Sequence, residues 1–568
     1  MPHVAFRAGF HLVSGPLAPA LAGESDAAVR AGRGLFARDP NTWSHDAAVQ
    51  QKILNRLGWL ASPALMAESI ARVKTFAEGI RRDGFTDVVL LGMGGSSLAP
   101  EVLRAVLGTQ AGWPRLHMLD STDPASVLAI ATDPKTTLYL LASKSGTTIE
   151  PNSLAAHFID VLQKAGVARW ADHFVAITDP GTELARRAEA EGFRDTFINP
   201  ADIGGRFSAL SFFGIVPSAL MGQDIESLVQ WGLDMLTEAQ MSSGDPTTNP
   251  AVGLGLLMAT GAKAGRDKMT LIVPPALEAF GLWVEQLVAE STGKQGVGVV
   301  PIAGETLAGA GAYGPDRVFV RLRVAGGADE AARDAQMQQL SGAPILTLDF
   351  EEPAALGAEF VRWEVATAVA GALLGVNPFD EPNVQTAKDA TNVLLARHKA
   401  DGALPVAAAD QILPSGVTLK LSTAARAALG TADPESLLSL VQAGDYVGIL
   451  AYLGPDPAFT TPVAAFRDGV RTKTGAATMF GYGPRYLHST GQLHKGGANN
   501  GVFVLVSDTP VQDVEIPGQP FSFATLELAQ ALGDFNSLDS TGRRAIHVHL
   551  PRPDAALLTE ALDLLLRA

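Results

Sequence analysis

One glutamate stands where a carboxyl group could act as a general base. The segment 275–294 predicts a helix that ends at Gly293, with Glu290 in its last turn and Gln286 four residues earlier on the same face. The negative end of the helix dipole disfavours an ionised carboxylate there, and burial would disfavour it further. Both effects raise the pKa of Glu290 towards the range that suits a base near neutral pH. From the residues alone, an exposed charge at the end of a helix is the commoner explanation.

Arg206 is a second candidate for chemistry. It follows Gly204 and Gly205 in the segment ADIGGRFSALSFFG (201–214). Two glycines allow a tight backbone turn, so that the guanidinium can project into a cleft and stabilise negative charge that develops during a reaction. The alternative is an arginine on a surface loop.

Two later segments carry groups that could move protons. In 373–395 one helix ends at Asn-Pro-Phe-Asp and another begins, which places Lys388 about two turns inside the second helix. In 481–503 the imidazoles of His488 and His494 are candidates, because an unperturbed pKa of about 6.5 suits proton transfer near neutrality. Lys388 could equally be solvated, and both histidines stay open as the proton-transfer group.

Two turns rich in glycine and hydroxyl groups could bind phosphate. The apolar run 136–143 leads into SKSGTTIE (143–150), and the run 86–92 leads into GMGGSSLAP (92–100). Each pattern predicts a strand, a turn and a helix start, where unpaired N–H groups and the helix dipole attract anions. A hydroxyl-capped helix would explain one such turn, whereas two turns from one sheet indicate a phosphorylated small molecule.

The glycine spacing argues against common nucleotide sites. Gly92, Gly94 and Gly95 form G-x-G-G rather than the dinucleotide fingerprint G-x-G-x-x-G, and no G-K-[ST] closes a Walker loop. An NAD-linked oxidoreductase is therefore disfavoured. No His/Asp group has the spacing of metal ligands, so we expect neither metal nor cofactor.

Composition bounds the class of protein. Of 568 residues, 47% are hydrophobic and 18% charged, which predicts large cores rather than disorder. The net charge of −16 disfavours nucleic-acid binding. The absence of cysteine excludes disulfides and fits a reducing cytoplasm. The apolar stretch 365–379 is too short to span a bilayer comfortably, and the glycines and prolines near Arg7 disfavour a signal peptide.

The order of apolar and amphipathic segments predicts an α/β fold with parallel sheets. Short apolar runs alternate with helix-length segments after residue 83, first at 86–92, 115–120, 136–143 and 173–179, then at 269–274, 317–324 and 343–350. Further strand-like runs lie at 445–453, 501–507 and 544–550. We expect a helical segment over 1–83, two doubly wound units over 84–240 and 241–400, and a C-terminal α/β region over 401–568. The turn-rich stretch 241–250 would link the two units.

Several of these segments resemble the glucose-6-phosphate isomerase family. The two hydroxyl-rich turns resemble those of its sugar-isomerase (SIS) domains, and 201–214 resembles one of its signatures nearly position for position. The string E-S-T-G-K that begins at Glu290 resembles its base-bearing helix, and 373–395 resembles F-D-Q-x-G-V-x-x-x-K. The string L-H-S-T-G-Q (487–492) resembles the one around the ring-opening histidine of bacterial members.

The resemblance implies reversible conversion of glucose 6-phosphate into fructose 6-phosphate through an enediolate. It implies Glu290 as the base, Arg206 as the stabiliser of the intermediate, and Lys388 with His488 in ring opening. The residues implied to bind substrate are Gly95, Ser96, Ser143, Lys144, Ser145, Thr148, Glu150, Gln286 and Glu381. Gly95 and Lys144 would contribute through the backbone, and Lys388 is expected to contact Glu150.

The sequence also departs from the family pattern. Glu381 stands where glutamine is usual, Asn383 replaces glycine, and the histidine string follows the lysine signature by about a hundred residues instead of preceding it. This order resembles the isomerase half of fused transaldolase–glucose-6-phosphate isomerase proteins. The family is usually dimeric, with the histidine donated across subunits, so a homodimer is one expectation. Two alternatives stay open: a combined phosphoglucose/phosphomannose isomerase, and a non-catalytic sugar-phosphate-binding SIS protein.

Two other groups of polar residues have more general interpretations. His547 and His549 alternate along an apparent strand and are expected to be structural. Asp120 and Asp123 follow a strand, where they could touch substrate or cap a turn.

Overall fold

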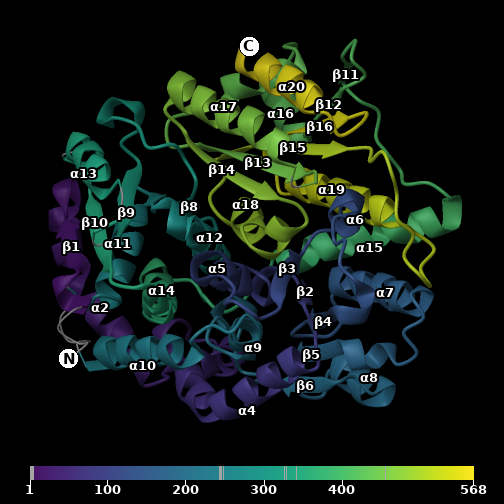
Figure 1. Ribbon diagram of the computed structural model, residues 1–568. Coiled ribbons are helices and arrows are strands. Elements are labelled where there is room, and N and C mark those ends of the chain that lie inside the picture. The colour runs from purple at the N-terminus through teal and green to yellow at the C-terminus, as the bar shows by residue number, and fades with distance from the viewer. Residues whose placement is uncertain are drawn as a thin grey trace.

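A computed structural model describes residues 6–241, 246, 248–324, 326–327, 329–340, 342–454 and 456–567. Its strands form three sheets, each flanked by helices, with the C-terminal region above the first two units in the view of Figure 1. Of the expected linker 241–250, residues 242–245 and 247 lie outside the described residues.

The first sheet is parallel throughout and has the order β3-β2-β4-β5-β6. Its strands are β2 (Asp87–Leu91), β3 (Arg115–Leu119), β4 (Thr137–Ala142), β5 (Phe174–Thr178) and β6 (Asp195–Ile198). The chain proceeds from β2 to one side and from β4 to the other, so the direction of winding changes between these two strands. Ligands of doubly wound sheets bind at such a switch point, beyond the carboxyl ends of the strands. Both hydroxyl-rich turns emerge there.

Helices cover both faces of the first sheet, and the N-terminal helices pack beside it (Figure 1). The helices that follow its strands are α5 (Leu98–Leu107), α6 (Pro124–Leu128), α7 (Ile149–Lys164), α8 (Glu183–Glu191), α9 (Phe212–Leu220) and α10 (Ile225–Met241). The N-terminal helices are α2 (Ala18–Phe36), α3 (Ala47–Leu54) and α4 (Ser62–Arg82).

The second sheet has the order β1-β10-β9-β7-β8. Its strands are β7 (Lys268–Ile272), β8 (Val300–Ile302), β9 (Arg317–Val324), β10 (Ile345–Phe350) and β1 (Phe10–Val13). Only β1 runs antiparallel, at the edge against β10. The helices of this unit are α11 (Val252–Lys263), α12 (Glu278–Thr292), α13 (Glu330–Gln339) and α14 (Leu356–Leu374).

The third sheet, in the C-terminal region, has the order β11-β12-β16-β15-β13-β14. Its strands are β11 (Gln411–Ile412), β12 (Thr418–Leu421), β13 (Tyr446–Tyr452), β14 (Ala477–Tyr482), β15 (Gly501–Asp508) and β16 (Arg544–Leu550). Its helices are α16 (Thr423–Leu429), α17 (Pro457–Thr474), α18 (Gly491–Gly496), α19 (Phe523–Ser540) and α20 (Ala555–Arg567). Helix α15 (Val384–Asp401) leads into this region and packs along α19.

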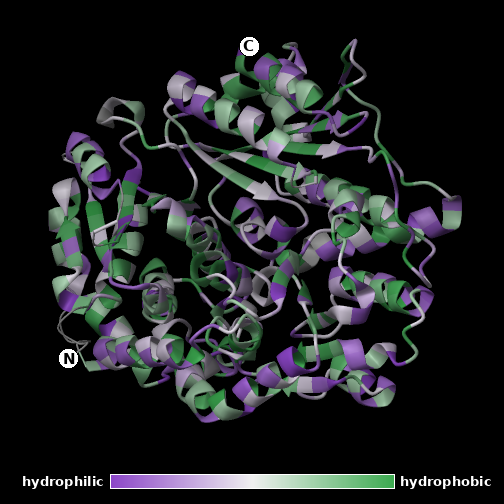
Figure 2. Ribbon diagram, in the orientation of Figure 1, coloured by the Kyte–Doolittle hydropathy of each residue, from purple (hydrophilic) through white to green (hydrophobic). Residues whose placement is uncertain are grey.

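The C-terminal region shares hydrophobic cores with both preceding units. Phe523 and Leu526 of α19 pack in one cluster with Leu154 and Phe158 of α7. Leu493 of α18 belongs to another cluster, which includes side chains of β8 and α12. In Figure 2 the strands are largely apolar, whereas polar colours concentrate on outward-facing helices. The three parts therefore form a common framework around the site between them.

The predicted fold class, an α/β protein with parallel sheets, is confirmed. Within the three sheets, β6, β8, β11, β12 and β14 were not predicted, and neither was β1. The first four are very short, and β14 contains Gly481, so their apolar pattern is weak. The segment 1–83 contains β1 as well as helices, because the half-buried Phe10–Val13 completes the second sheet. The domain boundaries stay a prediction. Within the described residues, no helix is long and apolar enough to cross a bilayer.

Candidate active site

The predicted site residues converge on one cavity of about 470 Å³ at the switch point of the first sheet, named here the main cavity. Every one of them lines it except Glu150. Glu150 lines a side cavity of about 230 Å³, and the two cavities share five lining residues, namely Ser145, Thr148, Val384, Lys388 and His488. The site thus draws on both α/β units and on the C-terminal region.

Glycines allow three turns to meet at the main cavity. The turns are the short 3₁₀ helices η4 (Gly94–Ser96), η7 (Gly205–Phe207) and η12 (Arg485–His488). A Cβ on Gly95 would stand 2.1 Å from the carbonyl oxygen of Gly205, so these backbones touch directly. Gly94 has φ +53°, and a Cβ there would lie 2.7 Å from the carbonyl oxygen of His488. The G-x-G-G motif therefore lets the other two turns approach the first sheet.

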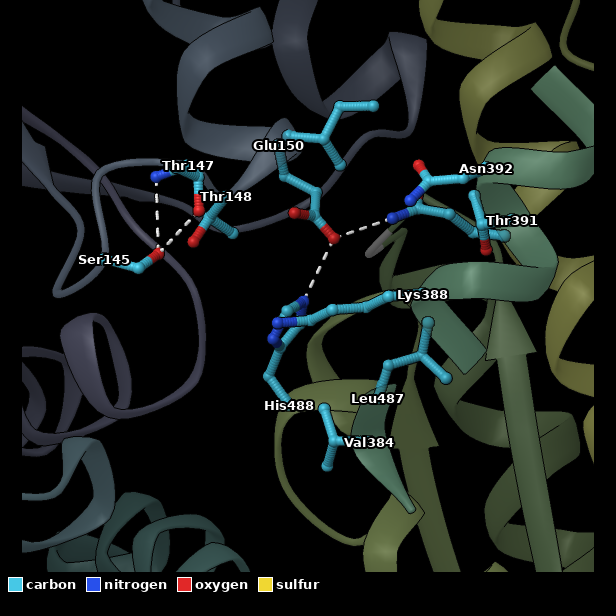
Figure 3. Close-up of a pocket in the computed structure, with 12 residues that line it drawn as sticks. Ser145, Thr147, Thr148, Glu150, Val384, Lys388, Thr391, Asn392, Leu487 and His488 are labelled. Atoms are coloured by element: carbon cyan, nitrogen blue, oxygen red, sulfur yellow. Dashed lines mark hydrogen bonds and ion pairs between the residues drawn. The ribbon is translucent and has the colours of Figure 1, made fainter. Parts of the chain in front are cut away.

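The turn after β4 presents hydroxyl groups just before α7 begins. The Ser143 hydroxyl lies 3.2 Å from that of Thr148 and accepts a hydrogen bond from the Gly146 amide at 3.1 Å. The hydroxyls of Ser145 and Thr147 are 3.1 Å apart on the same turn (Figure 3). With the α7 N-terminus behind them, these groups form a cluster of donors suited to a phosphate.

The ammonium of Lys144 is held away from the centre of this turn. It pairs with Asp179 and donates to the carbonyl of Ala201 at 3.0 Å. This arrangement leaves the Lys144 backbone on the turn, which is the part predicted to contribute. Asp179, at the end of β5, was not singled out from the sequence.

Arg206 is buried and rigidly held between two carboxylates. Its Nη1 lies 3.4 Å from Oε1 of Glu290 and 3.0 Å from Oε2 of Glu381. Nε donates to the Ser291 hydroxyl at 2.8 Å, and Nη2 donates to the carbonyl of Pro378 at 2.7 Å. With these donors engaged, the guanidinium has a fixed place beside Glu290 and needs little reorganisation to meet negative charge.

Glu290 has the electrostatics of a base. Helix α12 is buried almost throughout its second half, and Glu290 is only 7% exposed. Burial raises the pKa of Glu290 to about 7, against the opposing charge of Arg206 and with an added upward contribution from Glu381. The direction agrees with the sequence-based prediction, and burial is the leading cause. At neutral pH a substantial fraction of this carboxyl group can accept a proton.

His488, which is partly exposed, and the buried Glu150 form a second pair. Nε2 of His488 lies 3.0 Å from Oε1 of Glu150 (Figure 3). Burial opposes ionisation of Glu150, but the charge and hydrogen bond of His488 hold the pKa of Glu150 below its ordinary value, with help from the charge of Lys388. Figure 3 shows Lys388 reaching towards the imidazole from α15. Glu150 thus stays an anion facing two cations or proton donors.

The two candidate histidines occupy different environments. His488 lines both cavities. His494 is buried in the C-terminal region, where its Nδ1 lies 3.0 Å from the Tyr446 hydroxyl and its ring packs on Phe503. Burial holds the pKa of His494 well below its ordinary value. The geometry therefore favours His488 for proton transfer to a ligand.

Gln286 anchors the histidine turn. Its Nε2 donates to the carbonyl of His488 at 2.5 Å. Its Oε1 is buried in the wall of the main cavity and has no hydrogen-bond partner among the described residues. One end of this amide thus holds the turn, and the other can accept a hydrogen bond from a ligand.

Several residues of the site were missed by sequence reasoning. Arg56, after α3, lines the main cavity beside Asp179, and Asn392 lines the side cavity. Gln530 of α19 donates to Glu150 at 2.7 Å and accepts from the Thr122 hydroxyl at 2.8 Å. Isolated polar residues such as these gave no signal, since only long-range packing brings them to the site.

The two aspartates and two histidines that had more general interpretations make the following contacts. Asp123 caps α6 by accepting from the Ser126 amide at 2.7 Å, whereas Asp120 pairs with Arg485 at 2.6 Å next to the histidine turn. The Ser507 hydroxyl lies 2.7 Å from Nε2 of His547 and 2.9 Å from Nδ1 of His549. These contacts agree with the structural role expected of the two histidines.

Comparison with known proteins is consistent with this geometry. The sequence model of the Phosphoglucose isomerase family matches residues 63–311. A glucose-6-phosphate isomerase of Rubrobacter xylanophilus is 31% identical over 377 residues, which are 56% of this chain and 85% of that protein. The chain belongs to the glucose-6-phosphate isomerase family.

Solved structures resemble the same part of the fold. A hypothetical protein from Thermus thermophilus is 27% identical with a TM-score of 0.56, over 68% of this chain and all of that one. A glucose-6-phosphate isomerase from Chlamydia trachomatis is 20% identical with a TM-score of 0.50, over 65% of this chain and 78% of that one. The latter supports the fold alone. The more specific likeness to fused transaldolase proteins stays a prediction.

Proposed function

We propose that this protein interconverts glucose 6-phosphate and fructose 6-phosphate. The observation that carries the proposal is the convergence, on one cavity, of a hydroxyl-rich helix start and a buried Glu290–Arg206 pair. The first suits a phosphate, and the second suits proton transfer next to a developing oxyanion. Family membership points to the same reaction.

Binding begins with the phosphate. The hydroxyls of Ser143, Ser145 and Thr148 and the backbone amides at the α7 N-terminus hold its oxygens, and Ser96 contributes from the neighbouring turn. Because the phosphate is bound far from the reacting carbons, it fixes the position of the sugar chain relative to the catalytic side chains. The carbonyl end of Gln286 accepts from a sugar hydroxyl. Positioning of this kind converts part of the binding free energy into a lower barrier.

Ring opening uses the pair His488 and Glu150 with Lys388. The C1–O5 bond breaks as the ring oxygen gains a proton and the O1 hydroxyl loses one, which yields the open-chain aldehyde. His488 transfers the proton to and from the ring oxygen, while the anionic Glu150 orients the imidazole and Lys388 supplies further positive charge.

Isomerisation then depends on Glu290. Its carboxylate removes the proton from C2, and the resulting enediolate is stabilised by the Arg206 guanidinium. The same carboxyl group returns the proton to C1, while the O2 proton passes to O1, and the ketose results. Each proton-transfer step catalysed in this way typically gains about 10²–10⁴-fold.

A protein that only binds sugar phosphates would have no use for a buried carboxyl group with a raised pKa. Such a group is costly unless it is paired, and here it faces the cavity beside a fixed cation. This observation favours catalysis over sensing. The sugar phosphate is the proposed small-molecule partner, and we place the enzyme in the cytoplasm because the chain has no cysteine.

All predicted catalytic groups come from one chain, so a single subunit can complete the site even if the protein forms a homodimer.

A coupled assay with fructose 6-phosphate tests the proposal, with mannose 6-phosphate as the competing substrate. We expect conversion of fructose 6-phosphate to glucose 6-phosphate, and a loss of about a hundredfold or more in Glu290→Gln. Near-normal turnover in that variant would remove Glu290 as the base. Comparable rates with mannose 6-phosphate would broaden the activity to a combined isomerase.

A further inference from the structure

The C-terminal region contributes a second polar side chain to the proton-transfer pair, and its role deepens the proposed function. Gln530 of α19 donates from Nε2 to Oε1 of Glu150 at 2.7 Å, the same oxygen that lies 3.0 Å from Nε2 of His488. One carboxylate oxygen thus connects the α19 amide with the imidazole. Gln530 is separated from Glu150 by most of the chain, so the contact depends on docking of the C-terminal region.

The orientation of the Gln530 amide is fixed from its other end. The Thr122 hydroxyl, in the turn after β3, donates to Oε1 of Gln530 at 2.8 Å. An ionised carboxylate only accepts hydrogen bonds, so the NH₂ end must face Glu150 and the carbonyl end must face Thr122. Thr122, Gln530 and Glu150 are 0%, 2% and 3% exposed. Thr122, Gln530 and Glu150 are therefore shielded from water, whereas the His488 side chain, 14% exposed, faces the cavities.

The chemistry of an amide suits this position. A cation beside Glu150 would neutralise the charge that has to act on His488. A neutral amide satisfies one lone pair of the buried carboxylate and leaves its negative charge available. It also fixes the torsion of the carboxylate, and hence the direction from which His488 is held.

We propose that Gln530, oriented by Thr122, is a positioning residue for ring opening, acting on the substrate through Glu150 and His488. Gln530 leaves the C2-to-C1 proton transfer of Glu290 unaffected. The inference rests on the proposed isomerase activity, but the two can be tested separately, because opening and reclosing of the ring exchange the α and β anomers without any transfer between carbons.

The experiment measures the two steps in the full-length protein. Anomer exchange of glucose 6-phosphate is followed by NMR exchange spectroscopy in a Glu290→Gln background, where isomerisation is blocked and ring opening persists. We expect Gln530→Leu to slow anomer exchange by about tenfold, the effect of losing a hydrogen bond to a charged group. The matched control is Gln519→Leu, which changes an exposed glutamine of the same region and leaves the rate unchanged.

Thr122 provides a second test that preserves packing. Thr122→Val removes the hydroxyl at constant shape and is expected to slow anomer exchange about threefold, since the amide loses its orienting donor. Thr122→Ser keeps the hydroxyl and restores the rate. An equal effect of valine and serine, or no effect of either, would overturn the role of the hydroxyl.

Gln530→Glu separates positioning from a purely structural contribution. The introduced carboxyl can donate to Glu150 only when it is protonated, so the ratio of variant to parent anomer-exchange rates should fall as the pH rises. The charged and titratable groups that face Glu150 are His488 from η12, Lys388 from α15 and Tyr452 from β13, and all three are the same in both proteins. A pH-independent ratio would show that Gln530 only fills space.

The outcomes distinguish the two proposals. If the wild type does not isomerise, the proposed function fails, and if Glu290→Gln isomerises normally, only the assignment of Glu290 as the base fails. If the wild type isomerises and Glu290→Gln does not, yet Gln530→Leu exchanges anomers at the parent rate, only the inference about Gln530 fails. Melting temperatures of all variants are measured, so that a loss of fold in Gln530→Leu shifts the decision to the Thr122 pair.

Discussion

Glu381 should set the pH at which the proposed base becomes active. Its Oε2 and Oε1 of Glu290 lie 3.0 and 3.4 Å from the same nitrogen, Nη1 of Arg206. The negative charge of Glu381 raises the pKa of Glu290. Glu381 also pairs with Arg206 and so partly neutralises the positive charge that lowers the pKa of Glu290. Glu381→Gln removes both effects. The pKa of Glu290, now about 7, should therefore fall.

The size of the shift follows from the geometry. Because both distances end on one nitrogen, the two carboxylate oxygens are at most about 6.4 Å apart, where two unit charges interact by about 2.6 kcal/mol at an effective dielectric constant of about 20. The Glu381 side chain is 41% exposed, so solvent screening reduces this value to about 1 kcal/mol. One pKa unit corresponds to about 1.36 kcal/mol, so we expect a downward shift of about 0.7 units.

The assay measures kcat/KM for fructose 6-phosphate across the acid limb of the pH–rate profile, where activity falls as the pH decreases. A base must be ionised to act, so activity falls as the pH drops through the pKa of Glu290, and a lowered pKa moves the limb towards lower pH. The substrate phosphate also titrates at about pH 6, but its titration is the same in the assays of both proteins. Glu560→Gln, a matched loss of one exposed charge on α20, should leave the limb in place. A limb that stays fixed or moves upward in Glu381→Gln would refute the reasoning.

Three further outcomes follow from the site. Gly95→Ala should lower the melting temperature and the activity, since its Cβ would meet the Gly205 carbonyl at 2.1 Å and overpacking costs about 1–3 kcal/mol. The control is Gly205→Ala, whose Cβ has open space. Equal melting temperatures for the two variants would contradict the packing argument. Specific activity should stay constant on dilution below any dimer dissociation constant, because one chain supplies every predicted catalytic group. Activity assays and sedimentation at several protein concentrations test this, and a loss of specific activity on dilution would contradict it. Extended dialysis against EDTA should leave turnover unchanged, since each proposed step uses side chains alone; a loss restored by added metal would disprove that mechanism.

The local part of the site was predictable from the sequence. The strand–turn–helix patterns around Ser96 and Ser143 place both turns at one edge of a parallel sheet, and the structure has them there. Short motifs with strong periodicity on either side carry this information within a few residues. The buried position of Glu290 on α12 was not predictable from the residues alone, because an exposed charge at the end of a helix was the commoner explanation and only the family resemblance indicated a base.

Long-range contacts were not predictable in the same way. No local pattern indicates that Gln286 holds the His488 turn, that Gln530 reaches Glu150, or that Phe10–Val13 joins the second sheet. Each contact joins residues hundreds of positions apart and depends on how the units dock. The approach of Lys388 to Glu150 was inferred only by resemblance, and the charge of Lys388 does act on Glu150.

The most direct test of the central claim is hydrogen exchange at C2 of glucose 6-phosphate in D₂O, followed by proton NMR. A carboxylate that carries the proton between C2 and C1 through an enediolate exposes it to solvent, so the wild type should incorporate deuterium at C2, and Glu290→Gln should do so at least about a hundredfold more slowly. Wild-type exchange rates in Glu290→Gln, with isomerisation intact, would contradict the account.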